Sequence, residues 1–444
     1  YYPNDKRTET LEDKPFDMHN FEMLQKRVNN DTIQELLEEY GNNFIEWVDE
    51  IKNTDVLRIN FDYMSDYYIY KGEKKYFVRT HNSNVKTFYK MLMITIKNAK
   101  NSYDKMKEIN CVEYNYYENC YNAGLMKLKE SGTFDVVIGY DFKNSYLSLM
   151  ASKVKIEGVI QQFLFPMKEG TEKFIKKISM KNIQYGIYNV KITCDNEDFN
   201  KIFTFNYYNY YTHYDLFFCF ENKEKYGIKI KMVKDCEYNC LIYDKDDLID
   251  GSIFFSNLYH RLTELKQKYP KNKLIKMLGS SLWGHLCSSN KKWYKENECE
   301  NFNIGLSAED DCDYILLDEL HKKNGEVMTH LVQKNRPYLD KYRLKPFITS
   351  FQRLIISNIA NKYVDKIVRI HTDCICMDAS IKNDYKILPS DLCRTLLIED
   401  KSTGLINFKN IITYKKVIDG KTICEKCFRY FDDGKYCEYC AKKN

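Results

Sequence analysis

The sequence lacks the features that define membrane-spanning, secreted and low-complexity proteins. It contains no run of about 18 apolar residues, which excludes a hydrophobic segment long enough to cross a bilayer as a helix. Only 7 residues are proline and 17 are glycine, and no linker of simple composition divides the chain. The first residues, Tyr1 to Asn4, include neither an initiator methionine nor the apolar core of a signal peptide. We therefore expect a processed or truncated start.

The composition also lacks a dominant charge. The 68 basic residues nearly balance 63 acidic ones and leave a net charge of +5, so a nucleic-acid partner is permitted and its binding surface must be local. The 38 tyrosines and 25 phenylalanines accompany abundant Asn, Lys and Ile, a bias typical of an AT-rich genome, so their number is weak evidence for base stacking. The 16 cysteines without a secretory signal indicate an intracellular, reducing compartment such as a host cytoplasm or nucleus.

Hydrophobic periodicity predicts an α+β protein of two or three structural units, since 444 residues can bury a sizeable core. Residues 155–250 alternate apolar and polar positions and are predicted to be rich in β-structure. Helices are predicted at Asn20–Ile51, Ser252–Lys268, Lys273–Leu286 and Leu344–Tyr363, and strands at Val56–Tyr63, Tyr67–Tyr76, Thr133–Tyr140, Val364–Ile370 and Ile375–Asp378.

Two aspartates stand where strands end. Asp141 follows the predicted strand Thr133–Tyr140, and Asp373 lies between the two strands of a predicted hairpin. Nucleotidyl transfer needs two divalent ions held by carboxylates on rigid elements, with substrate and water completing the coordination. An aspartate at a strand end is more often a turn or helix cap, so spacing alone leaves both interpretations open.

The residues around these aspartates resemble the palm motifs of family B DNA polymerases. The first motif, Asp-x-x-Ser-Leu-Tyr-Pro-Ser, is similar to Asp141-Phe-Lys-Asn-Ser-Tyr146-Leu-Ser148. The second, Lys-x-x-x-Asn-Ser-x-Tyr-Gly, is similar to the segment from Lys276 to Gly284, and the third, Tyr-x-Asp-Thr-Asp-Ser, to Ile370-His-Thr-Asp373-Cys-Ile. Upstream, Tyr121-Asn-Ala-Gly-Leu125 resembles the template-contacting Tyr-x-Gly-Gly/Ala element. The motifs occur in the family's order, and the resemblance covers roughly residues 110–418.

The resemblance implies a right-hand polymerase with an antiparallel-sheet palm, helical fingers and two Mg²⁺ or Mn²⁺ ions bound by Asp141 and Asp373. The backbone near Phe142 would complete the metal coordination, Tyr146 would exclude a 2′-hydroxyl, and Lys276 would neutralise the triphosphate. Arg261 and Lys266 are further candidates for the phosphates, although a solvated helix face explains them equally well. The implied nucleotide-binding residues include Ser280 and Trp283; the implied DNA-binding residues are Tyr121, Ala123, Gly124, Tyr414 and Lys415.

Several positions depart from the family pattern. Leu147 replaces proline, Ser280 replaces asparagine and Trp283 replaces tyrosine. His371 stands in place of the first aspartate of Asp-Thr-Asp and removes a negative charge near the metal site. The primer-binding Lys-x-Tyr element is represented by Tyr414, with its lysine displaced to Lys415.

The long segment between the first two motifs resembles the insertion of the protein-primed branch, which contacts a terminal protein whose hydroxyl primes synthesis. Upstream of Asp141 we find no Asp-x-Glu motif of a proofreading exonuclease: either that domain lies outside this chain or the protein lacks it. The predicted organisation is an N-terminal region with the template element (1–130), a first palm segment (131–160), the insertion (161–250), fingers (251–290), a second palm segment (291–418) and a zinc module (419–444).

The zinc prediction rests on four cysteines at the C-terminus. Two Cys-x-x-Cys pairs separated by nine residues can supply four thiolates in tetrahedral geometry, the pattern of a closed structural zinc site. Neighbouring lysines could contact phosphates, or the module could simply clip the chain end. The predicted ligands are Cys424, Cys427, Cys437 and Cys440.

These observations favour a DNA-templated DNA polymerase of a virus or linear selfish element, using deoxynucleoside triphosphates, primer–template DNA and a terminal-protein primer. Two alternatives remain open at this stage. One is a degenerate paralogue that binds nucleic acid without synthesis, which His371 and Ser280 favour. The other is a zinc-bearing nucleic-acid-binding scaffold in which the motif matches are accidental and Asp141 and Asp373 would not lie together.

Overall fold

The computed structural model describes residues 65–70, 73–78, 103–142, 144–151, 153–156, 159–268, 282–322, 324–378, 396–398, 403–418, 421–423 and 430–432. The chain divides into two compact units: Tyr1–Met106 with Phe254–Ser288, and Lys107–Ile253 with Ser289–Asn444. Among the described residues, no helix combines the length and apolar character needed to span a membrane.

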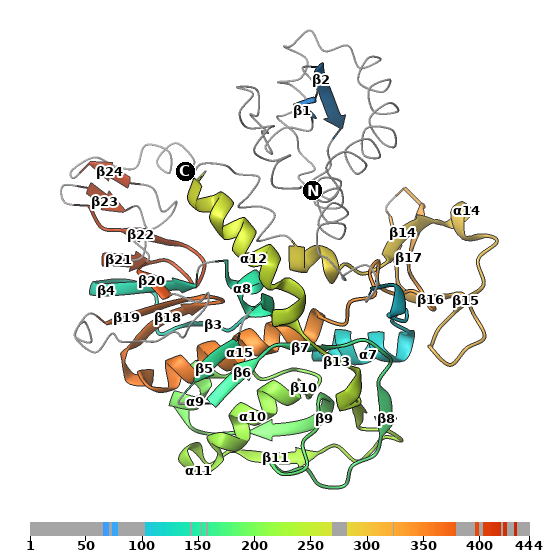
Figure 1. Cartoon of the computed structure of the whole chain (residues 1–444), viewed down its shortest axis with the longest axis horizontal. Coiled ribbons are helices and arrows are strands. Elements are labelled where there is room, and N and C mark those ends of the chain that lie inside the picture. Colours follow the sequence, from blue (N-terminus) through green and yellow to red (C-terminus); the bar gives the residue numbers. More distant parts are fainter. Residues whose placement is uncertain are drawn as a thin grey trace. The chain divides into compact units, whose positions relative to one another are not determined.

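A seven-stranded sheet forms the centre of the second unit, and all of its strand pairs are antiparallel. Its order is β22-β21-β4-β19-β18-β3, with β20 also paired to β4 (Figure 1). This confirms the predicted α+β character, the strand that reaches Asp141 and the hairpin around Asp373. The strands are β3 (Met126–Leu128), β4 (Gly132–Phe142), β18 (Ile367–His371), β19 (Cys374–Asp378), β20 (Leu396–Ile398), β21 (Gly404–Phe408) and β22 (Tyr414–Lys416).

Strands β18 and β19 are buried on both faces along most of their length. Along β19, the successive residues Cys374, Ile375, Cys376 and Met377 are all at most 5% exposed, although alternate side chains point to opposite faces. Cys374 and Cys376 belong to a core cluster with residues of β4, β18 and β21. A strand covered on both sides has an uninterrupted apolar run, which explains why this hairpin was readable from the sequence.

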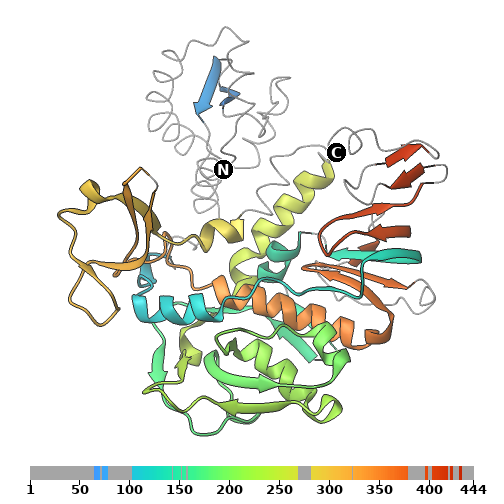
Figure 2. The same cartoon turned by 180° about the vertical axis from the view of Figure 1, so that it is seen from behind.

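Helix α15 (Lys345–Asn361) lies in the core of this unit. Pro346 lies in its first turn, where its missing N–H costs nothing. The helix buries polar residues as well as apolar ones, including Gln352 and Arg353. In both views α15 lies between the seven-stranded sheet and the insertion (Figures 1 and 2). The neighbouring helices are α7 (Cys111–Cys120) and α8 (Ser145–Ala151).

The predicted insertion contains a five-stranded sheet of order β10-β9-β12-β8, with β11 paired to β9. The expected richness in β-structure is confirmed, and three helices accompany it. Its strands are β8 (Thr171–Lys173), β9 (Gly186–Thr193), β10 (Tyr210–Thr212), β11 (Lys229–Met232) and β12 (Cys240–Ile242). Its helices are α9 (Glu197–Ile202), α10 (His213–Glu221) and α11 (Lys223–Tyr226), followed by the 3-10 helix η1 (Lys245–Asp247). Two small ribbons pair β5 (Lys153–Ile156) with β6 (Val159–Gln162), and β7 (Leu164–Pro166) with β13 (Leu248–Asp250).

A separate four-stranded sheet, of order β14-β17-β16-β15, occupies residues assigned above to the second palm segment. The sequence analysis did not anticipate it. It comprises β14 (Lys291–Lys295), β15 (Ile304–Gly305), β16 (Tyr314–His321) and β17 (Val327–Gln333), with helix α14 (Glu296–Cys299). Also in the second unit are the 3-10 helix η2 (Val364–Lys366) and the ribbon of β23 (Lys421–Ile423) with β24 (Tyr430–Asp432).

The predicted helix Ser252–Lys268 is confirmed as α12 (Gly251–Lys268), most of which belongs to the first unit. Its first residue must be glycine, because a Cβ there would lie 2.3 Å from the carbonyl oxygen of Met150. The predicted single strand Tyr67–Tyr76 is wrong in detail: the segment is a hairpin of β1 (Ser65–Tyr70) and β2 (Glu73–Val78). Residues 282–286 are helical, and the predictions for 20–51 and 56–63 lie outside the described residues.

Candidate active site

Asp141 lies near the end of strand β4, and Asp373 lies in the turn between β18 and β19, next to the start of the neighbouring strand β19. Asp141 is the next-to-last residue of β4, and its Cα pairs with Cys374, the residue that follows Asp373. The N–H of Phe142 donates a hydrogen bond of 3.1 Å to the carbonyl oxygen of Asp373. Both aspartates are partly exposed. The backbone pairing therefore brings the chain at Asp141 next to the chain at Asp373, and their role as metal ligands stays a prediction.

Asp373 is presented by a tight two-residue turn between β18 and β19. Thr372, the first residue of the turn, has a φ of 55°, a left-handed conformation that costs a β-branched residue on the order of 1–3 kcal/mol. Its hydroxyl lies 2.8 Å from Oδ1 of Asp373, and its N–H donates to the carbonyl oxygen of Leu125 at 2.8 Å. A positive φ at this position suits the twist of a hairpin, so the strained residue also orients the Asp373 carboxylate.

The template-element segment, residues 121–125, packs directly against this turn. Gly124 is buried, and a Cβ at this position would lie 3.0 Å from Cβ and Cγ2 of Thr372 and from Oε1 of Gln352. Gln352 is 1% exposed, and its amide nitrogen donates to Oγ of Ser145 at 2.7 Å. A side chain here would press on Thr372 and Gln352, which would have to give by a few tenths of an ångström, so the tight packing favours glycine independently of any DNA contact.

Arg353 holds the same segment from the other side. Its guanidinium makes a forked ion pair with Asp215, with N–O distances of 3.0 and 2.9 Å. Its remaining nitrogen donates to the carbonyl oxygens of Asn122 and Ala123 at 2.8 and 3.0 Å. Burial opposes the charge of Arg353, but the Asp215 carboxylate holds the pKa of the guanidinium above its usual value. This pair fixes the segment's backbone with strong charge-assisted hydrogen bonds.

Tyr121, at the exposed end of the segment, is 38% exposed. The amino group of Lys345 lies 4.8 Å from its ring centroid and forms an ion pair with Glu118. Burial disfavours the ionised form of Glu118, yet Lys345, together with Lys291 and Tyr338, lowers the pKa of that carboxyl. Tyr121 is therefore a partly exposed ring that a cation contacts.

The first-motif residues after Asp141 leave the sheet through a turn. Asn144 has a φ of 52°, and helix α8 begins at Ser145, the residue that Gln352 contacts. Phe142 is buried at 7% exposure and Tyr146 is partly exposed. A turn entering a helix was predicted here and is confirmed; the roles of Phe142 and Tyr146 stay predictions.

The other predicted nucleotide- and DNA-binding residues are placed only in part. Lys266 and Trp283 are partly exposed on helical segments of the first unit, and Arg261 lies on α12. Tyr414 packs its ring against the core cluster, with the Arg369 guanidinium 4.7 Å from its centroid, and Lys415 follows on β22. Outside the described residues lie Lys276, Ser280, Cys424, Cys427, Cys437 and Cys440.

The described residues contain no cluster of three or more His, Cys, Asp or Glu side chains suited to a metal ion. Two carboxylates nevertheless fit magnesium, which binds through one or two carboxylates and keeps water and substrate phosphates as its other ligands. Asp141, from strand β4, and Asp373, from the β18–β19 turn, are hard oxygen donors, so they could hold such ions together with a bound triphosphate.

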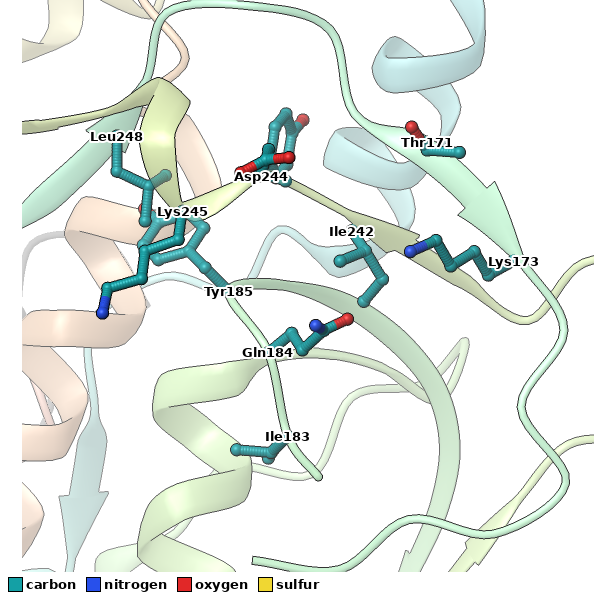
Figure 3. A pocket seen from close by; sticks show the side chains of 10 residues that line it. Thr171, Lys173, Ile183, Gln184, Tyr185, Ile242, Asp244, Lys245 and Leu248 are labelled. Carbon is teal, nitrogen blue, oxygen red and sulfur yellow. The ribbon is translucent and has the colours of Figure 1, made fainter. Parts of the chain in front are cut away.

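A pocket of about 430 Å³ opens elsewhere, on the insertion (Figure 3). Its lining includes Lys173, Tyr185 and Lys245, and none of the predicted site residues. The side chains of Lys173 and Lys245 do not converge on a common point in Figure 3, so the pocket offers no evident phosphate clamp.

Sequence reasoning missed the residues that position the site. Arg353 and Gln352 lie inside the apolar run of a predicted core helix, where charged and amide side chains are rare unless paired. The presence of Arg353 and Gln352 in this apolar run was therefore the sequence signal for buried side chains with partners. Asp215 was readable as well, since Thr212 and Asp215 form a capping box at the start of α10.

Comparison with known proteins gives structural similarity only. No family model matches the chain, and no curated protein matches it. Among solved structures, Phi29 DNA polymerase complexed with single-stranded DNA is 16% identical with a TM-score of 0.49, covering 82% of this chain and 61% of that one. Its ternary complex with primer–template DNA and incoming nucleotide is 15% identical with a TM-score of 0.47, covering 81% and 61%. The orthorhombic crystal form is 14% identical with a TM-score of 0.44, covering 85% and 76%.

The chain thus spans about three fifths of the length of the first two of these structures. At such identities and at TM-scores under 0.5, function does not transfer from these polymerases to this chain.

Proposed function

We propose that this protein is a DNA-templated DNA polymerase that adds deoxynucleotides by two-metal nucleotidyl transfer. The observation that carries the proposal is that Asp141, on β4, lies beside the β18–β19 turn that holds Asp373, a proximity that accidental motif matches give no reason to expect. The ordered motif resemblance supports the same reaction. Asp141 and Asp373 would hold the ions, which would activate the primer hydroxyl and neutralise the triphosphate.

The segment 121–125 supports a templated reaction. It touches the Asp373 turn through Gly124 and Thr372, so a strand bound at Tyr121 would lie close to the metal ligands. Arg353 fixes the backbone of this segment before any ligand arrives, which lowers the ordering cost of binding.

The direct test is primer extension on a short primer–template with Mg²⁺ or Mn²⁺. Asp373→Asn keeps the shape of the side chain and removes its charge, so we expect a loss on the order of 10³-fold or more, since metal stabilisation is worth several kcal/mol. The matched control is Asp135→Asn, an exposed aspartate on the same strand as Asp141. Equal extension by the wild type and Asp373→Asn would overturn the assignment.

A degenerate, DNA-binding paralogue is the second candidate, because His371 occupies the turn's flank where the family has an aspartate. A folded wild type that binds primer–template but extends no primer with either metal would favour this candidate. Restoration of extension by His371→Asp would then identify the lost carboxylate as the cause.

Priming by a protein is the finer element of the proposal, and the resemblance of residues 161–250 to the protein-primed branch supports it. We expect a labelled deoxynucleotide to become linked to a protein hydroxyl in a reaction with template and no oligonucleotide primer. Extension of an oligonucleotide primer without any protein-linked label would support the polymerase proposal and contradict priming by a protein.

A further inference from the structure

Two neighbouring tyrosines of the insertion are displayed to solvent. Tyr207 is 89% exposed and Tyr208 is 58% exposed, whereas Tyr211 and its partner across the sheet, Tyr188, are at most 1% exposed. Their rings meet edge to face, with centroids 5.1 Å apart and an interplanar angle of 88°. In this arrangement each ring keeps at least one flat face uncovered by the other. We call residues 205–209 the tyrosine turn.

The tyrosine turn is held in place by a fully bonded asparagine. Asn206 is 6% exposed; its Oδ1 accepts from the N–H groups of Tyr208 and Tyr210 at 2.8 and 3.2 Å, and its own N–H donates to the Tyr211 hydroxyl at 2.9 Å. Asn209 adopts a φ of 62° and its carbonyl accepts from the N–H of Val190 at 2.7 Å. The turn is therefore ordered before any partner binds, and the ordering cost of a contact is already met.

The turn is anchored to the helix that leads into the template-element segment. The side-chain nitrogen of Asn206 donates to the carbonyl oxygen of Asn119 at 2.8 Å, two residues before Tyr121. The ring of Tyr210 meets that of Tyr116 on the same helix, with centroids 5.6 Å apart. The exposed tyrosines and Tyr121 are thus attached to one rigid element, α7.

The exposed side chains of the turn are aromatic, which is the kind of surface on which unpaired bases stack. Residues 205–211 contain only aromatic and asparagine side chains and no charge. The exposed large side chains of the turn are all aromatic, namely Phe205, Tyr207 and Tyr208. The exposed aliphatic side chains of the described residues lie elsewhere: on or beside β3, β4, β15, β16 and β22, and, for Met180 and Leu339, in the loops before β9 and α15. Sites for unpaired nucleic acid use such aromatic rings, on which bases of any sequence stack.

We propose that the tyrosine turn is a stacking site for unpaired bases of a single-stranded template outside the catalytic centre. The inference rests on the proposed function, since it takes Tyr121 as a neighbouring template contact. The ligand is single-stranded DNA, because the faces of bases inside a duplex are covered by their neighbours.

The test measures binding to two fluorescent DNAs, a blunt duplex and the same duplex with a single-stranded oligo-dT template overhang. For the double substitution Tyr207→Ser with Tyr208→Ser, we expect about tenfold weaker binding to the overhang DNA and unchanged binding to the blunt duplex. The matched control, Tyr207→Phe with Tyr208→Phe, keeps both rings and should bind like the wild type. An unchanged thermal midpoint verifies folding of the variants.

Equal affinity of the wild type and the serine variant for the overhang DNA would overturn the proposal. A change in sedimentation of the protein alone, without a change in overhang binding, would instead make the turn an interface between two copies. This test is separable from that of the polymerase proposal, because DNA binding needs no catalysis. If the wild type extends no primer but its binding to the overhang DNA depends on the two rings, the stacking site is supported and the polymerase proposal is contradicted. Failure of the wild type to bind either DNA would contradict the proposed stacking site.

Discussion

Gly124→Ala should damage catalysis while adding only one methyl group. The new Cβ would lie 3.0 Å from three heavy atoms, Cβ and Cγ2 of Thr372 and Oε1 of Gln352. Unstrained contacts between carbon atoms lie at about 3.5–4.0 Å, so the Thr372 turn must retreat by roughly half an ångström. Overpacking of this kind costs about 1–3 kcal/mol of stability.

The displacement matters because Thr372 precedes Asp373 and its hydroxyl contacts the Asp373 carboxylate. Since a misplacement of about 1 Å can cost roughly 100-fold in rate, half of that predicts a loss of about tenfold in single-nucleotide extension. The assay is the extension rate at saturating primer–template, which separates positioning of the site from DNA affinity.

A second substitution makes the reasoning refutable. Thr372→Gly removes both carbon atoms that the new methyl group meets and suits the positive φ of the turn. If the contact is the cause, Gly124→Ala should reduce the rate less in the Thr372→Gly background than in the wild type. Wild-type rate and thermal midpoint for Gly124→Ala alone would refute the argument.

Three further changes have defined outcomes. Arg353→Lys keeps the positive charge but not the two parallel hydrogen bonds to Asp215. We therefore expect the free energy of unfolding, measured with denaturant, to fall by about 2 kcal/mol and primer–template binding to weaken. Unchanged values would contradict the anchoring role of Arg353. Glu118→Gln should lower the thermal midpoint at pH 7. The pKa of the Glu118 carboxyl lies below its usual value of 4.5 in the folded protein, so the difference from the wild type should disappear as the pH falls below 4.5 and the carboxylate is protonated. Glu130→Gln, at an exposed position, is the control. Elemental analysis should find one zinc ion per chain. Replacing either pair of the predicted ligands by serine should abolish zinc binding; the pairs are Cys424 with Cys427 and Cys437 with Cys440.

Local patterns predicted the elements that carry Asp141 and Asp373. A buried strand ending in a polar residue and two short apolar runs flanking a turn have strong signals within about ten residues, and both appear as β4 and the β18–β19 hairpin. In the structure the turn consists of Thr372 and Asp373 and is two residues shorter than the predicted turn. Pairing between the two elements depends on segments more than two hundred residues apart, and only the motif resemblance indicated it.

Elements with weak or conflicting local signals escaped prediction. Helix α10 consists largely of aromatic and β-favouring residues, and its helical state depends on a cap and on burial against α15. In the sheet of β14 to β17, strand β15 has only 2 residues, and β16 carries consecutive acidic residues, Asp318 and Glu319, beside a register shift. Tertiary packing decides such cases, because propensities differ by less than about 1 kcal/mol per residue.

The insertion belongs to the site's framework and is not an appended module. Asp215 belongs to α10 of the insertion, yet it pairs with Arg353, which fixes the segment that touches the Asp373 turn. A second buried connection joins Tyr243 of the insertion to Glu113, which pairs in turn with Arg343. Removing the insertion would leave Arg353 without its carboxylate, at a cost of about 3–5 kcal/mol for the unpaired charge, and would take the Tyr243 hydroxyl away from Glu113. A shortened chain that loses polymerase activity would therefore say little about protein priming, and point substitutions on the insertion's exposed surface are the informative way to separate priming from folding.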